Sequence, residues 1–252
     1  MELFSLSGKV ALITGGLGDI GRTLARGFAE AGADVALLDR SLLRQAEVEA
    51  AVRATGRRCV TLEADVRVKP QVDAAFQQAL DRLGRLDIAV NNAGLNIRGP
   101  AEELAEADLE TILDVNLKGV FLCAQAAARI MKARGGGKII NIASIGGTVA
   151  LPFSAAYCGS KGGVVLLTRA WAAEWAPFNI QVNAIGPTYI RTQLNAAFVD
   201  RPEIRERILR FTPAGRLGRC EDLVGTAIYL ASSASNLVTG QTIFVDGGYT
   251  AV

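Results

Sequence analysis

The chain has 252 residues, half of them hydrophobic and 21% charged, with a formal net charge of +2. This composition is typical of a compact globular protein and excludes a disordered or fibrous one. The balanced charge gives no indication of a nucleic-acid partner or an anionic membrane surface. No apolar run reaches the length that spans a bilayer, and no signal peptide is recognisable, so we expect no membrane association.

Short apolar, β-branched runs alternate with longer segments that carry apolar residues at helical spacing. The predicted strands are residues 9–14, 34–39, 58–62, 86–91, 138–142, 180–185 and 242–246, and the predicted helices are 20–31, 41–55, 70–83, 105–132, 155–175 and 221–231. This alternation predicts an α/β protein with a doubly wound (Rossmann), seven-stranded parallel sheet and helices on both faces.

No linker, internal repeat or low-complexity segment divides the chain, so residues 1–252 are predicted to form a single domain. Residues 189–212 follow the sixth predicted strand, are rich in charge and contain Pro202. Ligands of open α/β sheets bind beyond the carboxyl ends of the strands. We therefore expect this segment to be mobile and to cover a substrate site.

The chain has four cysteines and no histidine. Cys59, Cys123, Cys158 and Cys220 are far apart and form no C-x-x-C motif, so no zinc site is predicted. Scattered thiols of this kind are typical of a reduced, cytoplasmic protein. We expect no metal ion.

A glycine-rich run joins the first predicted strand to the first predicted helix. Glycines let the backbone turn tightly and approach a pyrophosphate, and the helix N-terminus offers free amides and a positive dipole end. Because the run has the strand–turn–helix context that this mechanism requires, it predicts a dinucleotide site. The run contains the candidate residues Gly15, Leu17, Gly18, Asp19, Ile20 and Gly21.

Asp39 ends the second predicted strand, eighteen residues after Gly21. A carboxylate there accepts hydrogen bonds from the adenosine ribose and repels a 2′-phosphate, which favours NAD over NADP. The adjacent Arg40 softens this preference, and a simple helix-starting role for Asp39 is the alternative. Further candidate cofactor residues follow the third and fourth strands: Asp65 and Val66, then Asn92, Ala93 and Gly94 after Asn91.

Tyr157 and Lys161 lie four residues apart, on one face of a predicted helix, and Ser144 lies thirteen residues before Tyr157. Without histidine, a tyrosine whose pKa is lowered by a lysine is a candidate acid/base. The alternative is a half-buried tyrosine with a solvated lysine one turn on. Ser144 supplies a hydrogen bond where alkoxide character would develop.

Together these motifs resemble the single-domain branch of the short-chain dehydrogenase/reductase family, over nearly the whole chain and in the family's order. The resemblance also rests on Asn116, Pro187 and the ending Asp246-Gly247-Gly248. It implies that Tyr157 is the acid/base, that Ser144 polarises the substrate oxygen, and that Lys161 holds the nicotinamide ribose. It further implies a homotetramer formed through residues 105–132 and 155–175. In addition, it implies that Asn116 anchors a water of the proton relay and that Pro187, Ile190 and Thr192 flank the nicotinamide and phosphates.

Two positions depart from the family pattern. Asp19 stands where the family usually has glycine, and a carboxylate near a pyrophosphate is unfavourable unless it points into solvent. Thr188 stands where glycine usually follows the proline, and it either donates to the nicotinamide carboxamide or restricts the loop. Both departures concern cofactor affinity more than chemistry.

The predicted function is that of an oxidoreductase that transfers a hydride between NAD(H) and a secondary alcohol or ketone. The expected substrate is a small polyol, sugar or sugar acid, since the chain is similar to the family's sugar-acid and polyol dehydrogenases. A substrate carboxylate would pair with Arg98, whose alternative role is a solvated loop charge. A 3-oxoacyl-thioester reductase is the second reading, against which Asp39 argues, and a low-turnover dinucleotide-binding protein is the third. The pocket is expected to include Asn96, Ile97, Arg98, residues 145–149, Phe153, Tyr189 and residues 193–211.

Overall fold

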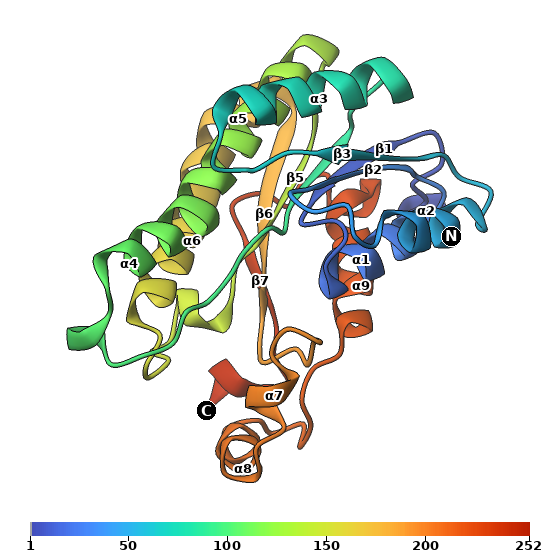
Figure 1. Cartoon of the computed structure of the whole chain (residues 1–252). Helices are drawn as coiled ribbons and strands as arrows, with labels where there is room; N and C mark the ends of the chain where they lie inside the picture. The colour runs from blue at the N-terminus through green and yellow to red at the C-terminus, as the bar shows by residue number, and fades with distance from the viewer. Residues whose placement is uncertain (1) are drawn as a thin grey trace.

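A computed structural model describes residues 2–252, which are built around one seven-stranded parallel sheet (Figure 1). The strand order is β3-β2-β1-β4-β5-β6-β7, so the direction of winding reverses between β1 and β4. The predicted seven-stranded doubly wound fold is therefore confirmed. The strands are β1 (Val10–Thr14), β2 (Asp34–Asp39), β3 (Cys59–Glu63), β4 (Ile88–Asn91), β5 (Gly137–Ile142), β6 (Ile180–Pro187) and β7 (Thr242–Val245).

Helices cover both faces of the sheet, as Figure 1 shows. One face packs against α1 (Asp19–Glu30), α2 (Gln45–Arg53) and α9 (Val224–Ala231), and the other against α3 (Lys69–Leu83), α5 (Val120–Arg134) and α6 (Ala155–Trp175). The central strands are buried along their whole length, which is why they have continuous apolar runs rather than an alternating pattern. Among residues 2–252, no helix is both long and apolar enough to cross a membrane.

The prediction of one continuous α-helix over residues 105–132 was wrong. It consists of α4 (Glu106–Leu113), a π-helical turn at Asp114–Gly119, and α5. Asn116 lies inside the π-helical turn and is fully buried. Gly119 closes this turn, where a Cβ would come within 2.8 Å of Val66 Cγ2. π-helical turns of this kind commonly occur at functional sites.

Residues 189–212 form two helices that the sequence analysis did not predict, α7 (Ala196–Val199) and α8 (Pro202–Arg210). They lie beyond the ends of β6 and β7, next to the C-terminus (Figure 1). Val199 and Ile208 form a small apolar cluster with Leu217, separate from the two large cores. The segment thus has regular structure and a small apolar cluster of its own.

Candidate active site

A cavity of about 860 Å³ lies beyond the carboxyl ends of the strands, where the winding direction reverses. It extends from Asp39, at the end of β2, to Tyr157 on α6. Of the predicted site residues, Gly21 and Asn116 do not line it. The residues that do are Gly15, Leu17, Gly18, Asp19, Ile20, Asp39, Arg40, Asp65, Val66, Asn92, Ala93, Gly94, Ser144, Tyr157, Lys161, Pro187, Thr188, Ile190 and Thr192.

The glycine-rich loop between β1 and α1 is held by close backbone packing. Gly15 has a φ of +60°, which favours glycine, and at Gly21 a Cβ would lie 2.1 Å from the Gly15 carbonyl oxygen. Gly21 therefore shapes the loop without lining the cavity. On the other side, Asp39 Oδ2 accepts the backbone N–H of Leu17 at 3.1 Å, so its carboxylate is fixed beside the loop.

Polar side chains tie the loops after β1 and β4 together. Thr14 Oγ1 accepts the backbone N–H groups of Asn92 and Ala93 at 3.0 and 3.1 Å, and Asn92 Nδ2 donates to the Thr14 and Gly15 carbonyls. Asn91 instead donates to Asn141 Oδ1 at 2.8 Å, inside the sheet. Asn92 therefore links the loops after β1 and β4, whereas Asn91 links the strands β4 and β5.

Tyr157, Ser144 and Lys161 come together at the end of the cavity that β5 and α6 form. Ser144 lies two residues after the end of β5, close enough to Tyr157 to affect the pKa of its hydroxyl. Lys161 is buried, and its Nζ donates to the Ile142 carbonyl at 2.7 Å and lies 5.8 Å from the centre of the Tyr157 ring. The pair thus faces one cavity, and its lysine is not the solvated residue of the alternative reading.

The expected direction of the Tyr157 pKa is wrong for the protein by itself. Burial raises the pKa of Tyr157, while the hydrogen bond with Ser144 and the charge of Arg98 act in the lowering direction. Burial also lowers the pKa of Lys161 to about 8, and Lys161 is not among the groups that lower the pKa of Tyr157. The lysine therefore does not by itself make the phenol acidic.

Asn116 acts on the site from behind the cavity wall. Its Oδ1 accepts the Leu95 N–H at 2.9 Å, and its Nδ2 donates to the Leu95 carbonyl at 2.8 Å and to Ser160 Oγ at 3.2 Å. These three bonds join the loop after β4 to α6, one residue before Lys161. In the structure the Asn116 side chain is therefore a brace for the loop.

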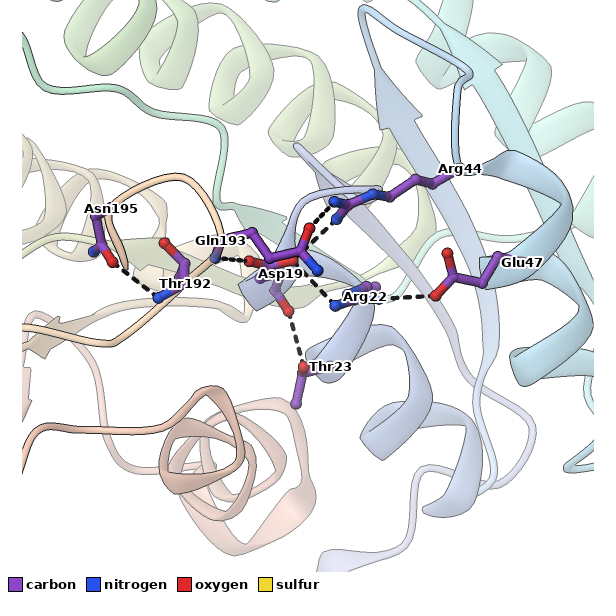
Figure 2. A network of polar contacts seen from close by, with 8 residues as sticks. All are labelled: Asp19, Arg22, Thr23, Arg44, Glu47, Thr192, Gln193 and Asn195. Atoms are coloured by element: carbon purple, nitrogen blue, oxygen red, sulfur yellow. Dashed lines mark hydrogen bonds and ion pairs between the residues drawn. The ribbon is translucent and has the colours of Figure 1, made fainter. Parts of the chain in front are cut away.

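The sequence analysis requires the Asp19 carboxylate to point into solvent if a pyrophosphate binds nearby. In the structure the carboxylate does not point into solvent. Its side chain is only 11% exposed and forms ion pairs with Arg22 at 3.1 Å and Arg44 at 3.0 Å (Figure 2). Two guanidinium groups thus offset its charge. Arg44 was not predicted as a site residue, because a residue near the start of a predicted helix carries no motif.

The substrate side of the cavity includes Asn96, Arg98, Ile145 and Tyr189, as predicted, together with Leu151, which was not predicted. The guanidinium of Arg98 lies 4.0 Å above the Phe198 ring, and among residues 2–252 it has no carboxylate within ion-pair distance. A second, smaller cavity of about 270 Å³ adjoins Arg98. Phe153 and Phe198 line that second cavity, and Ile97 lines neither.

The residues present fit a dinucleotide. The loop at the N-terminus of α1 turns its backbone toward the cavity, and a Cβ at Gly94 would lie 3.3 Å from Asn116 Oδ1 and 3.5 Å from Lys161 Nζ. The buried Thr188 hydroxyl lines the cavity and has no hydrogen-bond partner among residues 2–252. Over the same residues, no three or more His, Cys, Asp or Glu side chains are grouped so as to hold a metal ion.

Comparison with known proteins places this fold and site in one class. A family model described as enoyl-(acyl carrier protein) reductase matches residues 17–250, and the chain belongs to the short-chain dehydrogenase/reductase family. It is 44% identical to the 2-dehydro-3-deoxy-D-gluconate 5-dehydrogenase of Escherichia coli (strain K12), over 100% of this chain and 99% of that protein. It is 38% identical to an NAD-dependent glycerol dehydrogenase of Listeria innocua, over 98% and 96% of the two chains.

Among solved structures, a gluconate 5-dehydrogenase from Burkholderia cenocepacia, in complex with NADP and tartrate, is 45% identical. The TM-score is 0.96, and the match covers 100% of this chain and 98% of that one. The similar proteins are thus oxidoreductases that act on CH–OH groups of sugar acids and polyols. These relatives indicate that the cofactor is a nicotinamide dinucleotide.

Proposed function

We propose that this protein transfers a hydride between NAD and a secondary alcohol or ketone of a small sugar acid or polyol. The observation that carries the proposal is the meeting of Tyr157, Ser144 and Lys161 at one end of a cavity whose other end is bounded by Asp39. When bound, the dinucleotide supplies the hydride chemistry. The protein supplies orientation and proton transfer.

In this proposal Tyr157 moves the proton. As the phenolate, it takes the proton of a substrate alcohol in oxidation, and as the phenol it gives its proton to the carbonyl oxygen in reduction. Ser144 holds the same substrate oxygen, where its hydrogen bond stabilises developing alkoxide character. Because burial raises the Tyr157 pKa, the phenol is protonated at neutral pH, which suits carbonyl reduction.

Lys161 and Asn116 support this pair. The buried Lys161 ammonium is positioned by the Ile142 carbonyl and would hold the nicotinamide ribose. Asn116 links the loop at Leu95 to α6. In this proposal it also anchors a water of the proton relay. Gly15, Leu17, Gly18, Ile20 and the segment from Pro187 to Thr192 would surround the phosphates and nicotinamide.

NAD is the proposed dinucleotide because Asp39 presents a fixed carboxylate where the adenosine ribose would lie. The glycerol dehydrogenase of Listeria innocua is NAD-dependent, whereas the Burkholderia structure contains NADP. Arg40 and Arg44 line the same end of the cavity and favour a 2′-phosphate. A comparison of the two dinucleotides therefore tests the role of Asp39 directly.

Arg98 supports a substrate that carries a carboxylate. Its guanidinium is stacked on Phe198, faces the main cavity, and acts electrostatically on Tyr157. A carboxylate is the partner that a planar guanidinium binds best. A sugar acid would thus place its charged end at Arg98 and a hydroxyl-bearing carbon at Tyr157.

Absorbance of NADH during turnover of a panel of aldonic acids and uncharged polyols tests this function. We expect the aldonic acids to be the better substrates, and Arg98→Gln to lower kcat/KM for them by about 10²-fold while changing polyol turnover less than about threefold. Arg210→Gln, an exposed charge on α8 outside both cavities, is the matched control. Equal losses for both substrate classes would contradict the carboxylate role.

The proposed assembly is a homotetramer acting in the cytoplasm. Large apolar side chains remain exposed on the outer surfaces of α4, α5 and α6, including Leu109, Phe121 and Leu166. These are the helices that the family resemblance assigns to subunit contacts. Their exposure supports the assignment, because contacts between subunits would bury these side chains.

A further inference from the structure

Asp19 connects two parts of the protein that are remote in sequence. Its Oδ2 accepts the backbone N–H of Gln193 at 2.5 Å, and its Oδ1 binds Arg44 at 3.0 Å. Arg44 also donates to the Gln193 side chain. Figure 2 shows that these three residues form a closed set of contacts, which we call the Asp19 clasp.

The clasp joins opposite walls of the main cavity. Asp19 and Arg44 belong to the wall that α1 and the start of α2 form, whereas Gln193 follows β6 and leads into α7. All three line the cavity that extends from Asp39 to Tyr157. A dinucleotide that extends between those ends passes the clasp.

The segment held by the clasp is a compact turn. Asn195 Oδ1 accepts the Thr192 N–H at 2.9 Å, and Asn195 Nδ2 donates to the Ile190 carbonyl at 2.8 Å. Arg191 N–H donates to the Gly218 carbonyl at 3.0 Å, which anchors the start of the turn to the chain beyond α8. Residues 190–195 are therefore held together by their own hydrogen bonds, and Asp19 is the point where this turn meets the glycine-rich loop.

The charges favour a closed clasp. Burial alone would raise the pKa of Asp19, but the Gln193 amide, Arg44 and Arg22 outweigh it and lower the pKa, so the carboxylate is ionised at neutral pH. Hydrogen bonds to a charged group are stronger than those between neutral groups. Glu47 pairs with the other terminal nitrogen of the Arg22 guanidinium at 2.8 Å and does not contact Gln193.

We propose that Asp19 is a positioning residue that holds residues 190–195 across the dinucleotide cleft, and that opening of the Asp19 clasp limits exchange of the cofactor. This inference rests on the proposed dinucleotide site. It assigns a role to the position at which the chain departs from its family. A gate of this kind slows entry and release together, since both require the same opening.

Hydrogen exchange of the protein without cofactor tests the mechanical part. We compare Asp19→Gly, which restores the family residue, with Asp19→Asn, which keeps an acceptor for the Gln193 amide. Exchange over residues 193–199 should rise about tenfold in Asp19→Gly and less in Asp19→Asn. Glu47→Gln, which removes a charge from the same cluster, should leave that exchange unchanged. Unchanged exchange in Asp19→Gly would overturn the inference.

Stopped-flow NADH fluorescence tests the gate. In Asp19→Gly both the association and the dissociation rate constants should rise about tenfold, so that the Kd changes less than either rate. A rise in the dissociation rate alone would mean that Asp19 acts only as an equilibrium contact, and would overturn the gate. Absence of NADH binding by the wild type, with the expected exchange pattern intact, would instead refute the proposed dinucleotide site.

Discussion

Lys161 is needed for the proposed function, but its buried charge should destabilise the folded protein. Burial lowers its pKa from 10.5 to about 8, and at about 1.4 kcal/mol for each pKa unit this is a penalty of ~3 kcal/mol at neutral pH. Lys161→Met keeps the apolar stem and removes the charge. It also leaves the Ile142 carbonyl unpaired, which costs ~2 kcal/mol. We therefore expect the variant to be inactive but more stable than the wild type by ~1 kcal/mol at pH 7.

The pH dependence makes this prediction specific. Between pH 8 and 10.5 the folded protein binds fewer protons at Lys161 than the unfolded chain, so wild-type stability rises with pH in this window. The advantage of Lys161→Met should shrink by ~2 kcal/mol and change sign by about pH 10. Urea unfolding at several pH values measures the difference.

Lys138 provides the matched control, because burial lowers its pKa to about 8 as well, and it lies away from the cavity. Its Nζ donates to Asn236 Oδ1 at 2.9 Å. Lys138→Met should show a similar pH-dependent difference in stability while keeping turnover. A stability difference for Lys161→Met that stays constant from about pH 7 to 10 would refute the reasoning.

Two further predictions concern the cavity. Tyr157→Phe should lower turnover by at least about 10³-fold while the Kd for NADH, followed by fluorescence, changes less than about twofold; substantial residual turnover would rule out Tyr157 as the acid/base. Asp39→Ser should raise the ratio of kcat/KM with NADP to that with NAD by about tenfold, because it removes the carboxylate that Leu17 N–H holds at the cavity wall. An unchanged ratio in steady-state assays would contradict the ribose assignment.

The sheet was predictable because its strands are buried on both faces. Runs such as Val10–Thr14 and Asp34–Asp39 have almost no polar interruption, and the residues at their ends then fall at one edge of the sheet. That geometry alone explains why the glycine-rich loop, Asp39, Asn92 and Ser144 converge. The helix Ala155–Trp175 was predicted with the observed bounds from its apolar residues at helical spacing.

The sequence was less informative where side chains, rather than hydrophobic pattern, decide the backbone. The π-helical turn at Asp114–Gly119 contains no proline and keeps an apolar spacing close to that of an α-helix, so it left no signal. In residues 189–212 the charges masked α8, although Pro202 at its first turn was a usable start signal. The partners of Asp19 come from positions 44 and 193, and such remote pairing has no local pattern.

The π-helical turn makes the helical segment less regular, but it also positions the Asn116 side chain. Removal of one residue from Asp114–Gly119 would allow an unbroken α-helix from α4 through α5, with ordinary backbone hydrogen bonding throughout. The same deletion would rotate Asn116 by about 100° around the helix axis relative to one flank. The brace between Leu95 and Ser160 would then be lost. Deletion of one residue at this place would thus give a more regular helix but would break the contacts by which Asn116 joins the loop at Leu95 to α6.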